Sequence, residues 1–266
     1  MKTVMSIATS DSGGGAGIQA DLKAFARCGV HGTTAIVATT AQNTVGVNGI
    51  FAFPPQVAVD QIEAVVSDIG ADAVKTGMLF NAEIISAVAD AVRRLQLPNL
   101  VVDPVMVAES GATLLEPEAV DVYKTELFPL ATVITPNLNE AFALAKPGEE
   151  VDEERVRECA RALHALGPEA VIITGGHASS GADLLYDGES FVEIEGPRHE
   201  TDAAHGSGCT HSSSLASFLA LGYGLEEAAR RARAVAAEAV EYGLVNVGAG
   251  AGPVNVLGKV LKGVAP

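Results

Sequence analysis

Short runs of consecutive apolar residues alternate along this chain with longer segments in which apolar residues recur at helical spacing. The runs that favour β-strands are Val4–Ala8, Ala35–Ala38, Ala73–Val74, Leu100–Val102, Thr132–Ile134 and Val171–Ile173. Between them, apolar positions fall on one helical face around residues 62–69, 81–96 and 156–163. Because unbroken apolar runs imply burial on both faces of a strand, we expect a parallel sheet between two helix layers. The sequence therefore predicts an α/β fold with a doubly wound, mostly parallel central sheet.

The last third of the chain departs from this alternation. Segment 182–201 has an Asp-Gly turn between two strand-like runs, which predicts an antiparallel hairpin at the edge of the sheet. Two helices, at about 209–221 and 225–242, follow it. The sequence contains no Pro- or Ser-rich linker, charge block or internal repeat. We therefore expect one domain over residues 1–266.

The charge balance restricts the partners that this chain can bind. It has 17 Lys and Arg against 33 Asp and Glu, a net charge of −16, so its overall field repels phosphate backbones and acidic membrane surfaces. We expect no nucleic-acid or membrane partner, and local groups or a metal would have to hold an anionic substrate. The three widely spaced cysteines and the absence of a signal-peptide or membrane-helix pattern favour the cytoplasm.

Two glycine-rich segments precede predicted helices. The first, at residues 13–17, comes before a helix from about Ile18 to Arg27 and would let a ligand approach the backbone, although a simple tight turn explains it equally well. In the second, Gly206 and Gly208 precede an apolar helix that begins near Cys209. The unpaired N–H groups and the positive end of the helix dipole there suit a phosphate group. The same position favours the thiolate form of Cys209.

Polar residues follow several of the other strands, where ligands bind in open parallel sheets. Asp103 is held at a strand end by Pro104, and Asn137 and Glu140 have the spacing of a helix capping box. Capping accounts for these residues structurally, but Asp103 and Glu140 together could also offer oxygen ligands to a Mg²⁺ ion that carries phosphates. Two of the six histidines, His177 and His205, lie in candidate site loops. The other four, which we expect at the surface or in packing, are His31, His164, His199 and His211.

Eight segments carry a family resemblance, in order along the chain. They read SDSGGGAGIQADLKAF, ATTAQNTVGV, AVKTGMLF, VVDPVMVAESGATLL, ATVITPNLNEA, VIITGGH, DLLYDGE and HGSGCT. Together they resemble the hydroxymethylpyrimidine and hydroxymethylpyrimidine phosphate kinases of thiamine biosynthesis, members of the ribokinase-like superfamily. The resemblance implies a three-layer α/β/α fold and a homodimer. It also implies ATP-dependent, Mg²⁺-requiring phosphorylation of 4-amino-5-hydroxymethyl-2-methylpyrimidine and then of its monophosphate.

The matching motifs also imply roles for particular residues. Those that would bind the pyrimidine are Gly17, Asp21, Gln42 and Met78. Those on the nucleotide side would be Asp103, Asn137, Glu140 and Thr174, with Mg²⁺ held by Asp103 and Glu140, partly through water. The anion hole around the transferring phosphoryl group would consist of Gly206, Ser207, Gly208 and Cys209. We expect the Gln42 amide to read a ring nitrogen and an amino group, and Cys209 to help remove the hydroxyl proton.

Some positions depart from the family pattern. The departures are Thr174, Ala203, Ala204 and Ser207. Thr174 stands where many pyrimidine kinases have Lys and where related bacterial pyridoxal kinases have Thr, whereas Gln42 favours a pyrimidine substrate. A pyridoxal kinase or a kinase of dual specificity is therefore an alternative. A second alternative is a non-catalytic regulator that binds ligands with the same fold.

Overall fold

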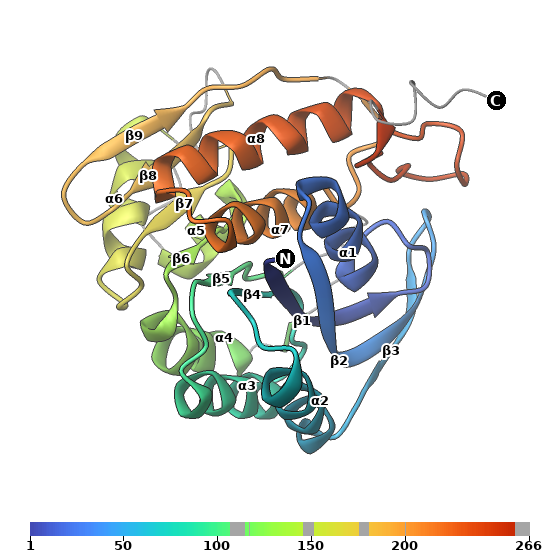
Figure 1. Cartoon of the computed structure of the whole chain (residues 1–266). Helices are drawn as coiled ribbons and strands as arrows, with labels where there is room; N and C mark the ends of the chain where they lie inside the picture. The colour runs from blue at the N-terminus through green and yellow to red at the C-terminus, as the bar shows by residue number, and fades with distance from the viewer. Residues whose placement is uncertain (107–114, 117, 146–151, 176–180, 200, 259–266) are drawn as a thin grey trace.

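A mixed β-sheet organises the protein (Figure 1). The computed structural model describes residues 1–106, 115–116, 118–145, 152–175, 181–199 and 201–258. Within these ranges the sheet has nine strands in the order β3-β2-β1-β4-β5-β6-β7-β8-β9. They are β1 (Thr3–Asp11), β2 (His31–Gln42), β3 (Val47–Ala52), β4 (Ala73–Thr76), β5 (Leu100–Val102), β6 (Val133–Ile134), β7 (Val171–Ile173), β8 (Asp183–Tyr186) and β9 (Phe191–Ile194).

The direction of the strands agrees with the predicted sheet in its centre and at one edge. The six strands β2, β1, β4, β5, β6 and β7, in their order across the sheet, pair in parallel. Strands β8 and β9 form the predicted antiparallel hairpin beside β7. At the opposite edge, β3 runs antiparallel to β2 and was not predicted. Its residues are largely exposed or half-buried, so it lacks the unbroken apolar run that marks the central strands.

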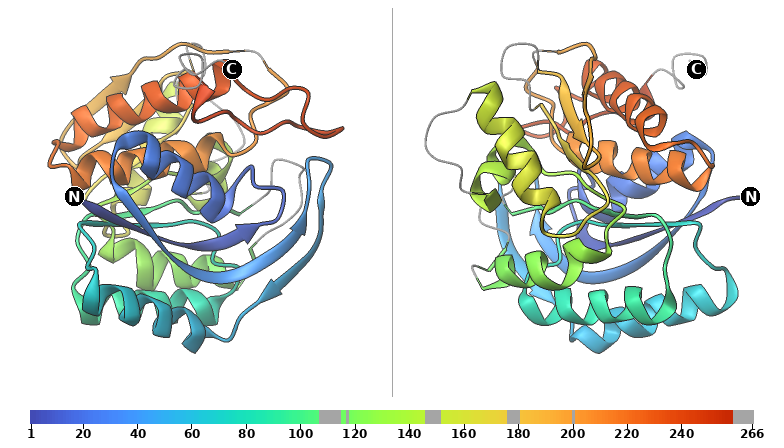
Figure 2. Two further views of the ribbon diagram at one scale, coloured as in Figure 1. Left: turned by 45° about the vertical axis from the view of Figure 1, so that its right-hand side comes forward. Right: turned by 90° about the vertical axis from the view of Figure 1, so that its left-hand side faces the viewer.

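Helices cover both faces of the sheet, so the three-layer α/β/α fold is confirmed (Figure 2). One face carries α1 (Gly17–Cys28), α7 (Ser207–Ala220) and α8 (Leu225–Glu241). The other carries α2 (Pro55–Asp68), α3 (Ala82–Leu95), α4 (Ala119–Val122), α5 (Leu138–Ala145) and α6 (Glu153–His164), with the short turns η1 (Tyr123–Leu127) and η2 (Phe128–Leu130) after α4. Each layer buries its own apolar cluster against the sheet.

Local chemistry fixes where several helices begin and end. The side chains of Asn81 and Asp152 accept hydrogen bonds from the first turns of α3 and α6, as capping residues do. Helix α1 ends at Gly29, whose φ of 79° is easily reached only without a side chain. No helix in the described ranges is long and apolar enough to cross a membrane. Because the central strands run parallel, the loops that follow them gather at one edge of the sheet.

Candidate active site

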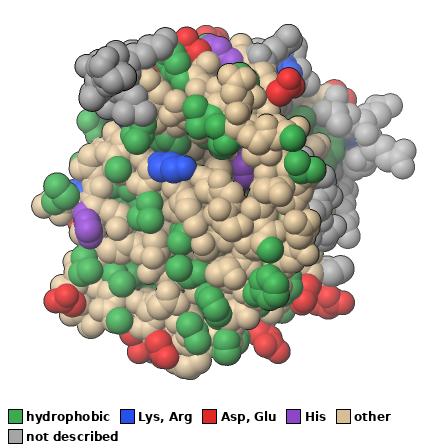
Figure 3. Space-filling view, turned by 90° about the vertical axis from the view of Figure 1, so that its right-hand side faces the viewer, with side chains coloured by type: hydrophobic (Ala, Val, Ile, Leu, Met, Phe, Trp, Pro, Cys, Tyr) green, Lys and Arg blue, Asp and Glu red, His purple; other side chains and the backbone are tan. Residues whose placement is uncertain are grey.

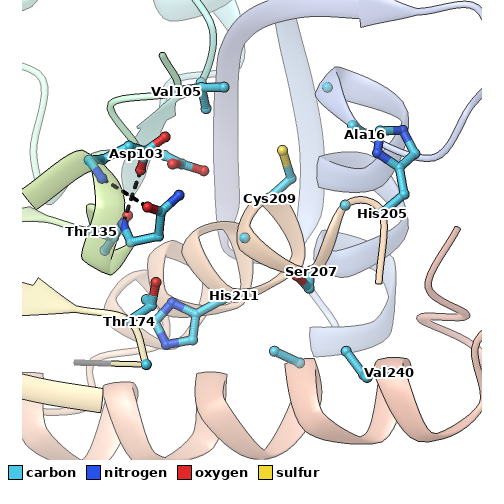
Figure 4. A pocket seen from close by; sticks show the side chains of 18 of the residues that line it. Ala16, Asp103, Val105, Thr135, Thr174, His205, Ser207, Cys209, His211 and Val240 are labelled. Carbon is cyan, nitrogen blue, oxygen red and sulfur yellow. Dashed lines mark hydrogen bonds between the residues drawn. The ribbon is translucent and has the colours of Figure 1, made fainter. Parts of the chain in front are cut away.

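A pocket of about 440 Å³ lies at the carboxyl ends of the parallel strands. Figure 4 shows side chains reaching it from β5, β7 and the start of α7, among them Asp103, Thr174 and Cys209. All the predicted site residues except Asp21 line it: Gly17, Gln42, Met78, Asp103, Asn137, Glu140, Thr174, Gly206, Ser207, Gly208 and Cys209. Segments far apart in the sequence thus converge on one cavity.

Helix α7 begins inside this pocket. Gly206, just before it, has a φ of 86°, and a Cβ atom there would collide with the carbonyl oxygen of Gly15. Only glycine therefore allows the two glycine-rich loops to approach each other. The N–H groups of Gly208 and Cys209 lie in the first turn, where an α-helix provides no carbonyl partner. Such N–H groups and the positive end of the helix dipole are suited to binding an anion.

The Cys209 thiol projects into the pocket between α7 and α1 (Figure 4). Burial raises the pKa of this thiol to about 12; the positive charge of Lys75 and the N–H group of Gly17 oppose the shift but do not cancel it. This direction runs against the predicted thiolate, because loss of solvent around the sulfur opposes the effects of the helix terminus and the cation. At neutral pH Cys209 is a thiol that can donate or accept a weak hydrogen bond.

Asp103 and Glu140 supply two buried carboxyl groups. Asn137 and Glu140 form the predicted capping box: the Asn137 N–H donates to Glu140 Oε2 at 3.0 Å, and the Glu140 N–H donates to Asn137 Oδ1 at 2.9 Å. Burial, and then the charge of Asp103, raise the pKa of Glu140 to about 8. Burial also raises the pKa of Asp103, although Lys75 opposes it. Because the negative charge of one carboxyl group makes ionisation of the other less favourable, a cation between them would stabilise both in their ionised forms.

At the floor of the pocket, Lys75, which lines the cavity, forms a fully buried ion pair with Asp21. Lys75 Nζ lies 2.8 Å from Asp21 Oδ1 and 4.0 Å from Asp103 Oδ2. The hydroxyls of Ser6 and Ser213 also donate to Asp21, at 2.5 and 2.7 Å. These bonds hold Asp21 beneath the pocket floor, and it does not line the cavity as the sequence led us to expect. Sequence reasoning overlooked Lys75, although a lysine inside the buried strand β4 is an unusual signal.

Gln42 and Met78 lie at the end of the pocket formed by β1, β2 and β4. Met78 is 8% exposed and offers an apolar surface. The amide of Gln42 contacts Thr40 Oγ1 at 3.0 Å and His205 Nε2 at 3.4 Å. The sequence placed His205 in a candidate site loop, whereas Asp11, which lies 3.3 Å from its Nε2, was not singled out. This end of the pocket combines an apolar surface with polar groups that a planar ring could contact.

The opposite end of the pocket contains Thr174 and a buried ionic cluster. Asp183 Oδ2 lies 3.3 Å from His211 Nε2, and Asp183 Oδ1 lies 3.7 Å from Arg233 and accepts the Gly175 N–H at 2.8 Å. His211 is thus a buried pocket residue. His199 lines the pocket too, so both histidines, which we expected at the surface or in packing, lie in the pocket wall. His177 lies outside the described residues.

Two of the four residues that depart from the family pattern, Ala203 and Ala204, do not line the pocket. Ala203 is completely buried, and a Cβ atom added at Gly243 would lie only 2.6 Å from it. Ala204 is half-buried and does not line the cavity. Thr174 and Ser207 do line it. The departures that could alter ligand contacts are therefore Thr174 and Ser207.

The fold and the site define a small-molecule kinase of the α/β class: a helix terminus and glycine loops for a phosphoryl group, a carboxylate pair, and a ring-sized apolar end. The family model for phosphomethylpyrimidine kinase matches residues 11–255. The hydroxymethylpyrimidine/phosphomethylpyrimidine kinase of Mycobacterium tuberculosis is 47% identical over 258 residues, which cover 96% of this chain and 93% of that protein. The chain belongs to the phosphomethylpyrimidine kinase family and is a phosphotransferase.

Other relatives agree with this assignment. The bifunctional thiamine biosynthesis protein ThiED of Geobacter sulfurreducens is 48% identical over 256 residues, and this chain spans about half its length, 52%. A crystal structure of phosphomethylpyrimidine kinase from Clostridium difficile is 38% identical, with a TM-score of 0.78 over 88% of this chain and 96% of that one. An ADP complex of Bacillus subtilis pyridoxal kinase is 36% identical, with a TM-score of 0.90 over 98% and 99%.

Proposed function

We propose that this enzyme transfers the γ-phosphoryl group of ATP to the hydroxymethyl group of 4-amino-5-hydroxymethyl-2-methylpyrimidine. A second transfer to the monophosphate then gives the diphosphate used in thiamine biosynthesis. Membership of the phosphomethylpyrimidine kinase family supports this proposal most strongly. The arrangement of Gln42 and Met78 at one end of the pocket, with the start of α7 between them and the nucleotide side, is compatible with such a substrate.

ATP is the proposed phosphoryl donor. The related Staphylococcus aureus pyridoxal kinase, 34% identical with a TM-score of 0.87 over 97% of this chain and 94% of that one, has been solved with AMP-PCP and pyridoxal. In this chain the nucleotide would extend past Asn137 and Thr174, with its terminal phosphate at the start of α7. The N–H groups of Gly208 and Cys209 would then stabilise charge on the transferring group, which is the main requirement of phosphoryl transfer.

Cys209 contributes in this proposal as a neutral thiol. A thiol with a pKa near 12 is a poor stoichiometric base at neutral pH, but its sulfur can accept a weak hydrogen bond from the substrate hydroxyl. In a loose phosphoryl-transfer transition state the nucleophile has little bond formation, so the hydroxyl can keep its proton until late in the step. Cys209 therefore orients the hydroxyl, and the proton passes to an oxygen of the transferred phosphoryl group as the new P–O bond forms.

Mg²⁺ would bind between the carboxyl pair and the phosphates. Among the described residues no cluster of three or more His, Cys, Asp or Glu side chains is arranged to hold a metal. Asp103 and Glu140 fit an ion that takes only one or two protein carboxylates and completes its shell with water and phosphate oxygens. Burial raises the pKa of both carboxyl groups, so a cation bound there would stabilise their charged forms. When bound, Mg²⁺ would neutralise the phosphate charge that builds up during transfer.

We also propose that the enzyme is a cytoplasmic homodimer. All three cysteines are free, as expected in a reducing compartment. Strand β3 is an edge strand with Phe51 61% exposed and Val45 66% exposed nearby. Figure 3 views this side of the molecule and shows hydrophobic side chains distributed over it. Sedimentation velocity tests the dimer: Phe51→Asp should shift a dimer toward monomer, and a wild-type monomer at micromolar concentration would refute it.

Pyridoxal kinase activity is the second candidate function. Thr174 in place of Lys and the similarity to pyridoxal kinase structures favour it. A coupled ADP-release assay with hydroxymethylpyrimidine, its monophosphate and pyridoxal, each with Mg-ATP, separates the candidates. We expect turnover with both pyrimidines. Turnover with pyridoxal alone would establish the alternative, and the absence of turnover with all three would favour a ligand-binding regulator.

A further inference from the structure

Asp11 is a buried carboxylate that has no hydrogen to donate. Its Oδ1 accepts the N–H of Gly13 at 2.7 Å, and its Oδ2 accepts those of Gly15 and Ala16 at 3.0 and 2.9 Å. Burial acts to raise the pKa of Asp11, but hydrogen bonds from His205 and from the loop N–H groups hold it below its ordinary value. Asp11 is therefore ionised at neutral pH and acts only as an acceptor.

His205 lies between this carboxylate and Gln42. Figure 4 shows its ring pointing toward the start of α1 beside Ala16. Its Nε2 atom is 3.3 Å from Asp11 Oδ2 and 3.4 Å from the Gln42 amide. The ring packs closely against Gly15, since a Cβ atom added there would lie 2.3 Å from its Cδ2 atom. Because Asp11 can only accept, the Nε2 atom that faces it must carry a hydrogen.

The hydrogen on His205 Nε2 in turn selects one orientation of the Gln42 amide. An amide nitrogen facing that N–H would place two donors against each other, whereas the amide oxygen would accept from it. In the structure, Thr40 Oγ1 lies 3.0 Å from the amide oxygen of Gln42. Rotating the amide by half a turn places the amide nitrogen there instead. The Thr40 hydroxyl can accept that hydrogen bond and still donate to the Ser10 carbonyl at 3.3 Å. Each of these contacts then pairs a donor with an acceptor.

We propose that Asp11 and His205 form a relay that fixes the Gln42 amide and thereby sets the direction in which the substrate ring binds. With its oxygen toward His205, the amide presents an acceptor and a donor in a fixed order to the pocket. A ring with an amino group next to a ring nitrogen can pair with both in one orientation only. A ring without that pair cannot. His205 is thus a positioning and specificity-determining residue that acts through Gln42. The identity of the substrate rests on the proposed function, but the relay does not.

Three variants test the relay in the full-length enzyme. His205→Phe keeps a planar ring but removes the hydrogen-bond donor, and His205→Gln restores an N–H group. Thr40→Val removes a hydroxyl on the other side of the same amide, which can either donate or accept a hydrogen bond. The readout is kcat/KM for hydroxymethylpyrimidine divided by kcat/KM for pyridoxal. We expect His205→Phe to reduce this ratio roughly tenfold, as loss of one orienting hydrogen bond does, and His205→Gln to recover most of it. Thr40→Val should lower both values together.

Equal changes of the ratio in His205→Phe and Thr40→Val, or no change in either, would overturn the relay. A second measurement on the wild-type protein needs neither turnover nor a variant. In ¹⁵N-histidine NMR spectra recorded where the ring is neutral, we expect the hydrogen of His205 on Nε2, and a hydrogen on Nδ1 alone would overturn the proposal. An enzyme without pyrimidine turnover but with the Nε2 hydrogen would refute the proposed substrate while supporting the relay.

Discussion

Lys75 and Asp21 form an ion pair of 2.8 Å between two side chains that are both completely buried. Burial alone would lower the pKa of Lys75, but the charge of Asp21, which also accepts a hydrogen bond from Lys75, and the charge of Asp103 keep it above its ordinary value. The lysine is therefore a permanent cation below the anion site. Lys75 Nζ also lies 4.0 Å from Asp103 Oδ2. The ion pair therefore links the buried core to the carboxyl group of Asp103 in the pocket.

Removing only the lysine should destabilise the protein strongly. Lys75→Met leaves the Asp21 charge buried without a partner, and we expect the free energy of unfolding to fall by about 3–5 kcal/mol. The double variant Asp21→Asn, Lys75→Met removes both charges, while Ser6 and Ser213 can still bond to the amide. Urea unfolding should show a smaller loss in the double variant than in the single one. Equal losses would contradict a role of the charge pair.

Glu140 should make the stability of the free enzyme depend on pH. Its pKa is raised from 4.5 to about 8 by folding, so the folded state binds its proton more tightly than the unfolded state does. The associated stability is present below pH 4.5 and is lost as the pH rises through 8. A few kcal/mol are involved, since one pKa unit corresponds to about 1.4 kcal/mol.

The variant Glu140→Gln isolates this effect because glutamine preserves the capping box. We expect its thermal unfolding midpoint to change much less between pH 5 and pH 9 than that of the wild type. Parallel pH curves for the two proteins would contradict the raised pKa. The variant should also lose most kinase activity if Glu140 helps to hold Mg²⁺ in place.

Cys209 should react slowly with alkylating reagents. Its pKa of about 12 leaves little thiolate at neutral pH. In a variant with Cys28→Ala and Cys159→Ala, Cys209 is the sole thiol. Its reaction with iodoacetamide, followed by mass spectrometry, should accelerate about tenfold per pH unit from 7 to 9. A rate that levels off near neutral pH would show that the helix terminus dominates after all.

The two glycines at the start of α7 should differ in their tolerance of a side chain. Gly206→Ala forces a Cβ atom against the Gly15 carbonyl at a φ of 86°, and we expect a loss of about 1–3 kcal/mol or more. Gly208→Ala is the matched control, because a Cβ atom there meets nothing within 4 Å. Its stability should be unchanged or slightly higher. Equal destabilisation in urea would contradict this account of the loop contact.

The central sheet could be predicted from sequence because its strands are unbroken apolar runs. Strand β3 could not, since it is an exposed edge whose residues alternate irregularly. Likewise, the capping box of Asn137 and Glu140 depends on local spacing and was predicted correctly. Features that depend on the nearest neighbours along the chain, or on a strong apolar signal, are those that the sequence reveals.

Contacts between distant segments were less accessible. Asp21 was expected in the pocket wall, but bonds to Lys75 and Ser213, far away in sequence, hold it below. The pKa of Cys209 depends on how much solvent the folded pocket removes, which no motif records. The place of His211 in the pocket could not be predicted either, because its partner Asp183 lies on the edge hairpin, far away in the sequence.

The most direct test of the central claim is a competition for limiting Mg-ATP. Purified enzyme is incubated with equal concentrations of hydroxymethylpyrimidine and pyridoxal, and the phosphorylated products are quantified by mass spectrometry. The product ratio reports the ratio of the two kcat/KM values directly. We predict that pyrimidine monophosphate and diphosphate dominate. Predominance of pyridoxal phosphate would contradict the assignment of the substrate.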